Sequence, residues 1–217
     1  MPPIRLQPGK IVCVGLNYQH HADEMGKAVP EEPLIFLKPP SSVIASGEAI
    51  ELPSQSQEVH HEGELAIVIG ERTRRAGQTE AASNILGYTC ANDVTARDIQ
   101  RREQRYTRAK GFDTFCPLGP NLVLAGDFIP AEHHLEVRVN GEVRQFSRLD
   151  DFIFSIPRVV SFISHVMTLY PGDVILTGTP AGVASLLPGD LVEVEIEGIG
   201  ILENRVRAGT LTETLKS

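Results

Sequence analysis

The sequence lacks tryptophan, has only three cysteines and contains no long hydrophobic run. Cys13, Cys90 and Cys116 lie in or beside apolar sequence and form no C-x-x-C pair, so we expect buried free thiols rather than disulfides or a thiolate zinc site. No stretch approaches the roughly 18 apolar residues of a membrane span, and MPPIRLQPGK has no apolar signal-peptide core. We therefore expect a cytoplasmic protein with no membrane partner.

Basic residues are scarce, with 20 Lys and Arg against 28 Asp and Glu and a net charge of −8. This balance argues against a nucleic-acid partner or an anionic membrane surface. With 217 residues, 41% of them hydrophobic, the chain can bury a full core. No repeat or linker divides it, and we predict a mainly β, α+β catalytic domain over residues 46–217, with residues 1–45 packed on it as an arm.

The periodicity of apolar residues predicts many strands and a few short helices. Asn140-Gly141, between two alternating runs, is a strong hairpin signal. Helices are predicted over 17–26, 78–86 with a cap near Thr79, 95–105 and 155–167, whereas 109–120 is interpreted as a loop. Strands are predicted at 11–15, 34–39, 49–52, 63–70, 87–95, 122–126, 134–139, 142–146 and 173–178, with a hairpin over 190–206.

The segment EVHHEGELAIVIG, residues 58–70, places acids at the start of a buried strand. Glu62 and Glu64 share one face of that strand, and an uncompensated buried carboxylate costs several kcal/mol. The chain must therefore expose this end or supply a cation. Asp93 ends the next apolar strand, and three carboxylates together would suit Mg²⁺ or Mn²⁺, with Ca²⁺ and zinc less favoured. The alternative is a rim of solvated acids or helix caps.

An ordered set of segments resembles the fumarylacetoacetate hydrolase family. The resemblance is to its short single-domain members: acylpyruvate hydrolases, oxaloacetate decarboxylases and hydroxyheptadienedioate isomerases. It implies a mixed β-roll core, a homodimer, and a Mg²⁺ or Mn²⁺ site formed by Glu62, Glu64 and Asp93. The segments are GLNYQHHADEMG, FLKPPSSV, VHHEGELAIVIG, NDVTARDIQ, KGFDTFCPLGP, VNGEVRQ, PGDVILTGTPAGV and the closing hairpin.

The resemblance also assigns roles to side chains outside the acidic cluster. His21 and Glu24 are implied as a catalytic pair, with Glu24 orienting His21 as a general base for water. Lys110 would place its ammonium over a substrate carboxylate or oxyanion, and we interpret His61 as structural support. The hydroxyl and amide of Thr179 are expected to donate to a substrate carboxylate. The implied substrate-binding residues are Asn17, Arg97, Gly178 and Thr179.

Two positions depart from the family pattern. Leu16 stands where many relatives have a basic residue, which makes a distal-carboxylate contact less certain, and Gly63 stands between the two glutamates, where it weakens the strand slightly. The predicted function is Mg²⁺-dependent cleavage of a carbon–carbon bond in a small 2-oxo acid, an acylpyruvate such as fumarylpyruvate or acetylpyruvate, with oxaloacetate decarboxylation second. The alternatives are 2-hydroxyhepta-2,4-diene-1,7-dioate isomerisation in aromatic catabolism and an inactive metal-binding structural dimer.

Overall fold

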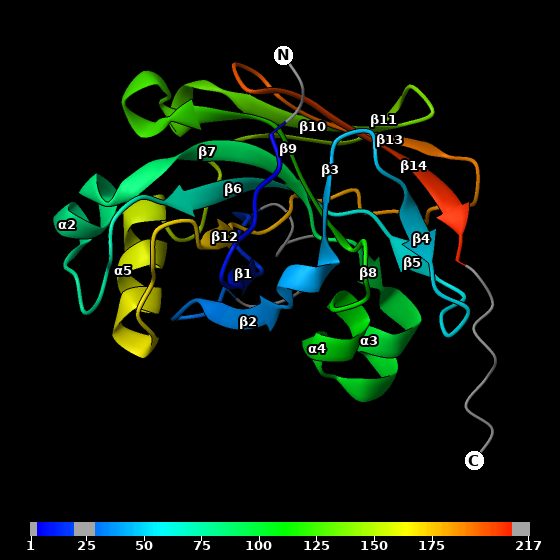
Figure 1. Cartoon of the computed structure of the whole chain (residues 1–217), viewed down its shortest axis with the longest axis horizontal. Helices are drawn as coiled ribbons and strands as arrows, with labels where there is room; N and C mark the ends of the chain where they lie inside the picture. The colour runs from blue at the N-terminus through cyan, green and yellow to red at the C-terminus, as the bar shows by residue number, and fades with distance from the viewer. Residues whose placement is uncertain (1–3, 20–28, 210–217) are drawn as a thin grey trace.

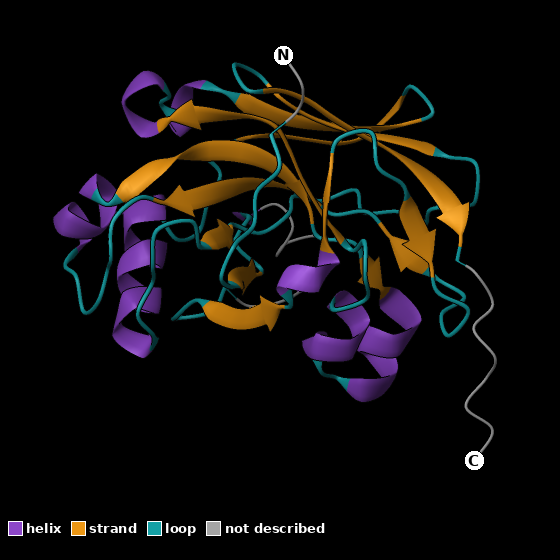
Figure 2. Ribbon diagram, in the orientation of Figure 1, coloured by secondary structure: helices purple, strands orange, loops and turns teal. Residues whose placement is uncertain are grey.

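Two β-sheets packed face to face form the centre of the chain (Figures 1 and 2), and the computed structural model describes residues 4–19 and 29–209. The larger sheet has the order β2 (Leu34–Lys38), β1 (Ile11–Gly15), β12 (Val174–Leu176), β6 (Gly63–Ile69), β7 (Ile85–Asn92), β9 (Cys116–Leu124) and β3 (Val43–Ala45). The smaller has the order β11 (Glu142–Arg148), β10 (His134–Val139), β13 (Leu191–Ile196), β14 (Gly200–Ala208) and β4 (Ile50–Leu52).

Short helices lie at two edges of this sandwich. α2 (Gln78–Ser83) packs on α5 (Ile156–Val166), whose buried side chains recur at helical spacing, while α3 (Arg97–Glu103) and α4 (Tyr106–Lys110) lie together near β2 (Figure 1). A two-stranded ribbon of β5 (Val59–His60) and β8 (Thr95–Ala96) leads into α3. Within the described ranges, no helix has the length and apolar character of a membrane-crossing segment.

Both sheets contain parallel and antiparallel pairs, which confirms the predicted mainly β, α+β fold. β1 pairs in parallel with β12 and antiparallel with β2, and β3 pairs with β9, so all three strands within residues 1–45 belong to the larger sheet. The hairpin of β10 and β11 is confirmed, and Asn140 and Gly141 both have the positive φ that a tight hairpin turn uses.

Two predicted elements differ from the structure, and a third lies mostly outside the described residues. α2 begins after Gly77 rather than near Thr79, and it ends at Ser83 because Ile85 already pairs with Ile69 in the sheet. The predicted loop 109–120 contains the end of α4 and the first half of β9, where pairing with β3 overrides the local effect of the prolines. Of the helix predicted over 17–26, only residues 17–19 are described.

Two apolar clusters fill the interior. The larger lies between the sheets, and the smaller includes Cys13, Ala66, Val68 and Cys116 from the larger sheet. All three cysteines are free and buried, as predicted. The smaller cluster uses the side chains that follow Glu64 on the same face of β6, so the acidic end of that strand continues directly into packed core.

Gly63 allows β6 to approach the smaller sheet closely. A Cβ atom at this position would lie 2.2 Å from Val137 Cγ2 on β10 and 3.3 Å from Val194 Cγ1 on β13. Every residue of β6 is buried, so the strand has no free side toward which it can move. The close packing therefore requires a residue without a side chain at position 63, although glycine also lowers the intrinsic stability of the strand.

We expect Gly63→Ala to lower the free energy of unfolding by about 1–3 kcal/mol, the usual cost of overpacking a core. Val137→Ala removes the atom that the new methyl group meets, so the double variant should lose less than the sum of the single losses. Urea denaturation measures each value. Gly126→Ala is the control because nothing lies within 4 Å of its Cβ position, and additive losses at 63 and 137 would contradict the packing explanation.

Candidate metal centre and its cavity

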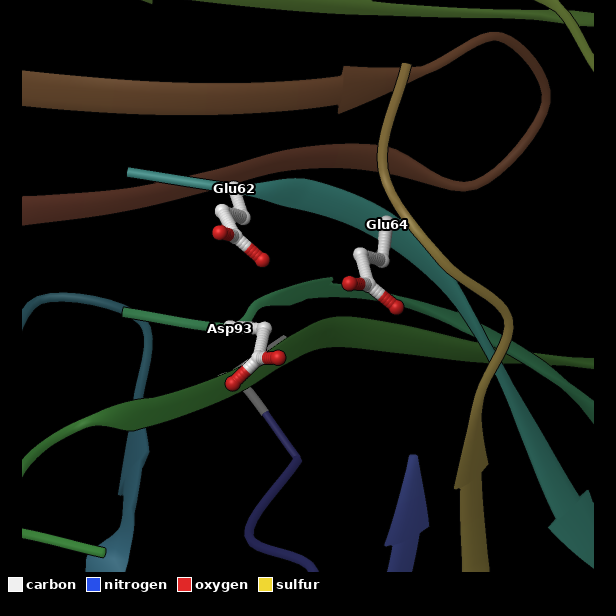
Figure 3. Close-up of side chains that lie close together, drawn as sticks. All are labelled: Glu62, Glu64 and Asp93. Carbon is white, nitrogen blue, oxygen red and sulfur yellow. The ribbon is translucent and has the colours of Figure 1, made fainter. Parts of the chain in front are cut away.

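Three carboxylates meet at one edge of the larger sheet (Figure 3). β6 and β7 are antiparallel neighbours with Gly63 opposite Asn92, so the start of one strand lies beside the end of the other. Glu62 and Glu64 flank Gly63, Asp93 follows Asn92, and one oxygen of each carboxylate lies within 4.8 Å of the others. All three side chains are buried. The predicted convergence of these acids is therefore observed.

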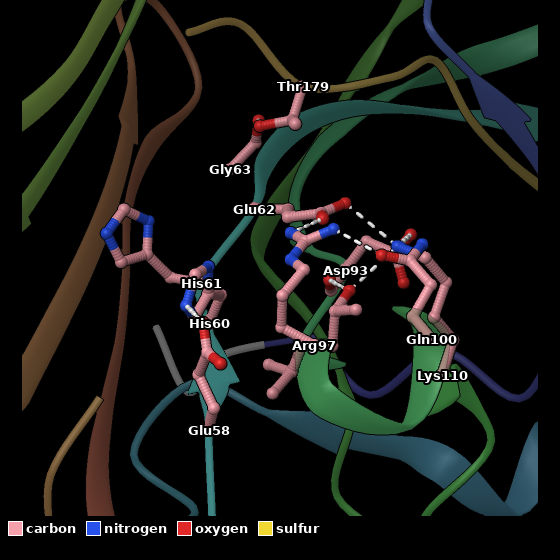
Figure 4. Close-up of polar contacts among 12 residues, drawn as sticks. Glu58, His60, His61, Glu62, Gly63, Asp93, Arg97, Gln100, Lys110 and Thr179 are labelled. Atoms are coloured by element: carbon pink, nitrogen blue, oxygen red, sulfur yellow. Dashed lines mark hydrogen bonds and ion pairs between the residues drawn. The ribbon is translucent and has the colours of Figure 1, made fainter. Parts of the chain in front are cut away.

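Cationic side chains from three other elements compensate this acidic cluster, and Figure 4 shows two of them, Arg97 and Lys110. Lys38 Nζ, at the end of β2, lies 2.6 Å from Asp93 Oδ1. Lys110 Nζ, at the end of α4, lies 2.6 Å from Asp93 Oδ2 and 2.8 Å from Glu62 Oε2. Arg97, at the start of α3, pairs with Glu62 Oε1. Of the two alternatives that the sequence posed, exposure or compensation, the chain uses compensation.

Glu62 and Glu64 differ in their electrostatic surroundings. Burial raises the pKa of Glu62, but Lys110 and Arg97 outweigh it and hold that pKa below its usual range. Burial, followed by the charges of Asp93 and Glu62, raises the pKa of Glu64 well above its usual range. Among the described residues Glu64 forms no ion pair, and its Oε2 accepts a hydrogen bond of 2.6 Å from the Gly178 amide. Glu64 is thus the carboxylate whose charge the chain compensates least.

The residues present fit a hard divalent cation. The donors are carboxylate oxygens without sulfur or imidazole among them, which is the preference of Mg²⁺, Mn²⁺ and Ca²⁺. Within residues 4–19 and 29–209 Glu64 has no cationic partner, and each carboxylate oxygen of Glu62 and Asp93 keeps lone-pair capacity beside its ion pair. An ion held by Glu62, Glu64 and Asp93 would complete the neutralisation of the cluster.

The cluster forms one wall of a cavity of about 810 Å³. Its lining also includes polar Arg97, Gln100, Lys110 and Thr179, together with Val14, Leu16, Leu34, Phe36 and Tyr106. The ring centroid of Phe36 lies 5.2 Å from Lys110 Nζ. A cavity lined by both charged and apolar side chains suits a small organic acid that has a carboxylate and a carbon skeleton.

The structure places the other predicted residues around this cavity in different ways. Gly178 has a φ of +98°, and a Cβ there would lie 2.9 Å from Asn17 Cβ, so only glycine allows this approach. In this structure the Thr179 hydroxyl donates to Gly63 O over 2.8 Å, and its predicted donation to a substrate carboxylate stays a prediction. Asn17 is buried, and its amide bonds to Thr177 O and Phe154 N, each at 2.8 Å. It therefore holds two segments together beside the cavity.

Sequence reasoning missed some residues of the site and could place others only in part. Lys38 has no predicted role. The signal that could have identified it is a single positively charged residue at the end of an otherwise apolar strand. Arg97, predicted to bind substrate, lines the cavity and pairs with Glu62, and its contact with a substrate stays a prediction. His61 turns away from the cluster (Figure 4), and burial lowers its pKa to about 4. His21 and Glu24 lie outside the described residues.

Comparison with known proteins identifies the class to which this fold and acidic cavity belong. Residues 10–207 match the family described as fumarylacetoacetate (FAA) hydrolase C-terminal. The match covers most of the chain, and the chain belongs to this family of enzymes. The resemblance found in the sequence is thereby confirmed.

Relatives with named activities are similar over nearly the whole chain. A bovine mitochondrial oxaloacetate tautomerase, FAHD2A, is 44% identical over 92% of this chain and 67% of its own length. The structure of 5-carboxymethyl-2-hydroxymuconate delta-isomerase from Mycobacterium smegmatis is 48% identical, with a TM-score of 0.89 over 97% of this chain and 83% of that one. A fumarylacetoacetate hydrolase from Exiguobacterium antarcticum is 40% identical, with a TM-score of 0.88 over 95% and 78%.

We expect Lys38→Met to destabilise the chelator-treated protein and to increase its stabilisation by Mn²⁺. Loss of one partner of a buried ion pair costs about 3–5 kcal/mol, and the more negative cluster should attract a divalent ion more strongly. Thermal denaturation with and without Mn²⁺ measures both effects. Lys10→Met, which breaks a pair with buried Asp173 away from the cavity, should lower the melting temperature without changing the Mn²⁺ response. Equal Mn²⁺ responses in all three proteins would disprove the role of Lys38.

Proposed function

We propose that this chain is a divalent-metal-dependent enzyme that acts on a small 2-oxo acid through the enolate of its substrate. The observation that carries this proposal is the convergence of Glu62, Glu64 and Asp93 in the wall of the cavity. The cavity also carries cationic Arg97 and Lys110 for an anionic substrate. Membership of an enzyme family and the 2-oxo acid chemistry in the name of the bovine relative support it.

Glu62, Glu64 and Asp93 would hold the ion, for which Mg²⁺ is the first candidate and Mn²⁺ the second. Such an ion supplies Lewis acidity toward a carbonyl oxygen. Lys110 and Arg97 add positive charge on the same side of the cavity, where they favour binding of a carboxylate and stabilise negative charge that develops during reaction. The apolar residues around Phe36 offer packing contacts to the carbon skeleton of the substrate.

Carbon–carbon cleavage is the first candidate reaction. His21 and Glu24 are spaced for a base and its orienting acid, and water activated by His21 would attack the distal carbonyl of an acylpyruvate. Oxaloacetate decarboxylation needs the same enolate stabilisation but no attacking water. The fumarylacetoacetate hydrolase among the similar structures supports the hydrolytic candidate.

Proton transfer without cleavage is the second candidate. The bovine relative is named a tautomerase of oxaloacetate and the Mycobacterium smegmatis relative is named an isomerase. Both reactions pass through an enol or enolate, so the same ion, with Lys110 and Arg97, would serve them. The two candidates differ only in whether a carbon–carbon bond breaks.

A substrate panel separates these candidates. Oxaloacetate, acetylpyruvate, fumarylpyruvate and 5-carboxymethyl-2-hydroxymuconate are each supplied with Mg²⁺. Loss of enol absorbance without pyruvate release identifies proton transfer, and pyruvate release, measured with lactate dehydrogenase, identifies cleavage. Inactivity toward every member, with Mg²⁺ or Mn²⁺ bound, would favour the structural dimer over an enzyme.

We expect Glu62→Gln to abolish turnover and Mn²⁺-dependent thermal stabilisation together, because an amide is a poorer ligand than the carboxylate it replaces. Chelation should abolish the activity of the unmodified chain and leave its circular dichroism unchanged, since a core of this size does not depend on an ion. Glu58→Gln is the matched control, because Glu58 pairs with His60 and Arg101 outside the carboxylate cluster. Full activity in EDTA would exclude the metal.

His21→Ala should slow acylpyruvate hydrolysis by about 10²-fold or more, the range for loss of a positioned general base, while Mn²⁺ affinity stays nearly constant. Oxaloacetate decarboxylation should fall less, because it needs no activated water. Steady-state kinetics on both substrates give the ratio, with adjacent His20→Ala as control. Equal losses would mean that His21 positions the substrate instead, and no loss would remove it from the site.

A further inference from the structure

Gln145 connects the two sheets directly behind the metal-binding edge. It lies on β11, the edge strand of the smaller sheet, and it is the one residue of that strand that is buried. Its side chain reaches Gly63 on β6 and Thr179 in the loop after β12. Figure 4 shows Thr179 beside Gly63, with the ring of His61 on the far side of the strand from Lys110.

All hydrogen-bonding capacity of the Gln145 amide is used. Oε1 accepts from the Gly63 amide and faces His61 Nδ1, each at 3.0 Å, while Nε2 donates to Thr179 Oγ1 at 2.8 Å and Pro180 O at 2.7 Å. Gly63 N can only donate and Pro180 O can only accept, so the amide has one allowed orientation. That orientation requires His61 to donate from Nδ1, which fits a neutral ring.

These hydrogen bonds form a closed ring through Gly63, Gln145 and Thr179. Its amide donates to Gln145, and its carbonyl accepts the Thr179 hydroxyl over 2.8 Å. The neighbouring Gly178 amide donates to Glu64 Oε2, so the same loop contacts a proposed metal ligand. The Thr177 hydroxyl also donates to Leu65 O over 2.8 Å, so the loop is bonded to three successive residues of the ligand strand.

We propose that Gln145 is a positioning residue that sets the distance between the metal ligands of β6 and the Gly178-Thr179 loop. The inference rests on the proposed function, because it assigns to this loop the carboxylate end of a 2-oxo acid beside the metal. Gln145 touches neither ion nor substrate, since it does not line the cavity. It acts through Thr179, whose hydroxyl is held on one side by Gln145 and on the other by Gly63.

The test uses Mn²⁺ alone and Mn²⁺ with oxalate, an inert dicarboxylate that chelates a metal as a 2-oxo acid does. In calorimetry, Gln145→Met should bind Mn²⁺ within a few-fold of the unmodified chain, yet weaken oxalate binding by about 10-fold or more because the loop is displaced. Thr179→Val should show a similar loss, and Thr179→Ser should not. The double variant Gln145→Met with Thr179→Val should be no weaker than the worse single variant.

Asn204→Leu provides the matched control for loss of a buried amide. Asn204 Nδ2 donates to the Ala45 and Glu48 carbonyls at 2.9 and 2.8 Å, so its removal should lower stability and leave oxalate affinity unchanged. If Gln145→Met does not fold, Gln145→Glu replaces it, because a carboxylate keeps the contact to Gly63 N and loses both donations.

Several results would overturn the inference: unchanged oxalate affinity in the Gln145 variant, an equal loss in Asn204→Leu, or losses that multiply in the double variant. Failure of the unmodified chain to bind Mn²⁺ would instead refute the proposed function, and the inference with it. The Mn²⁺ titration of the unmodified chain therefore distinguishes the two failures.

Discussion

The burial of three carboxylates at one edge of a sheet is the constraint on which the rest of this site depends. Their mutual repulsion and their loss of hydration must be offset locally, and the chain does this with ammonium and guanidinium groups from β2, α3 and α4. The arrangement also explains why the cavity has a charged lining: two of the compensating side chains, those of Arg97 and Lys110, line it together with the three carboxylates.

The smaller sheet supports this edge from behind through close packing and saturated hydrogen bonding. Gly63 has no side chain, so β6 can lie against Val137, and at the same residue both backbone polar groups find partners in Gln145 and Thr179. Side chains alternate along a strand, so the carboxylates of Glu62 and Glu64 lie on one face of β6 and the Gly63 position faces the smaller sheet. Geometry at the acidic edge is therefore determined by a sheet that contributes nothing to the cavity wall itself.

Local patterns in the sequence were sufficient for most strands, the Asn140-Gly141 hairpin, α5 and the convergence of the acids, because period, turn chemistry and strand adjacency are short-range properties. They were insufficient for the first half of β9, where prolines argue against a strand that pairing with β3 nevertheless forms. Lys38 and Gln145 could not be placed either. The partner of Lys38 lies 55 residues away, and those of Gln145 lie at least 34 residues away, so no local pattern encodes which distant group each buried side chain will meet.

The bond from the Gly178 amide to Glu64 spans 114 residues of chain, and this separation has a consequence during biosynthesis. At a translation rate of about 5–20 residues per second, the ribosome adds Gly178 roughly 6 to 20 seconds after Glu64. Lys38 precedes the cluster and Lys110 follows it by a few seconds, so the nascent chain can neutralise Glu62 and Asp93 early. Glu64 gains the amide partner that it has in this structure only after residue 178 has been added, so the contacts at the start of β6 are completed late.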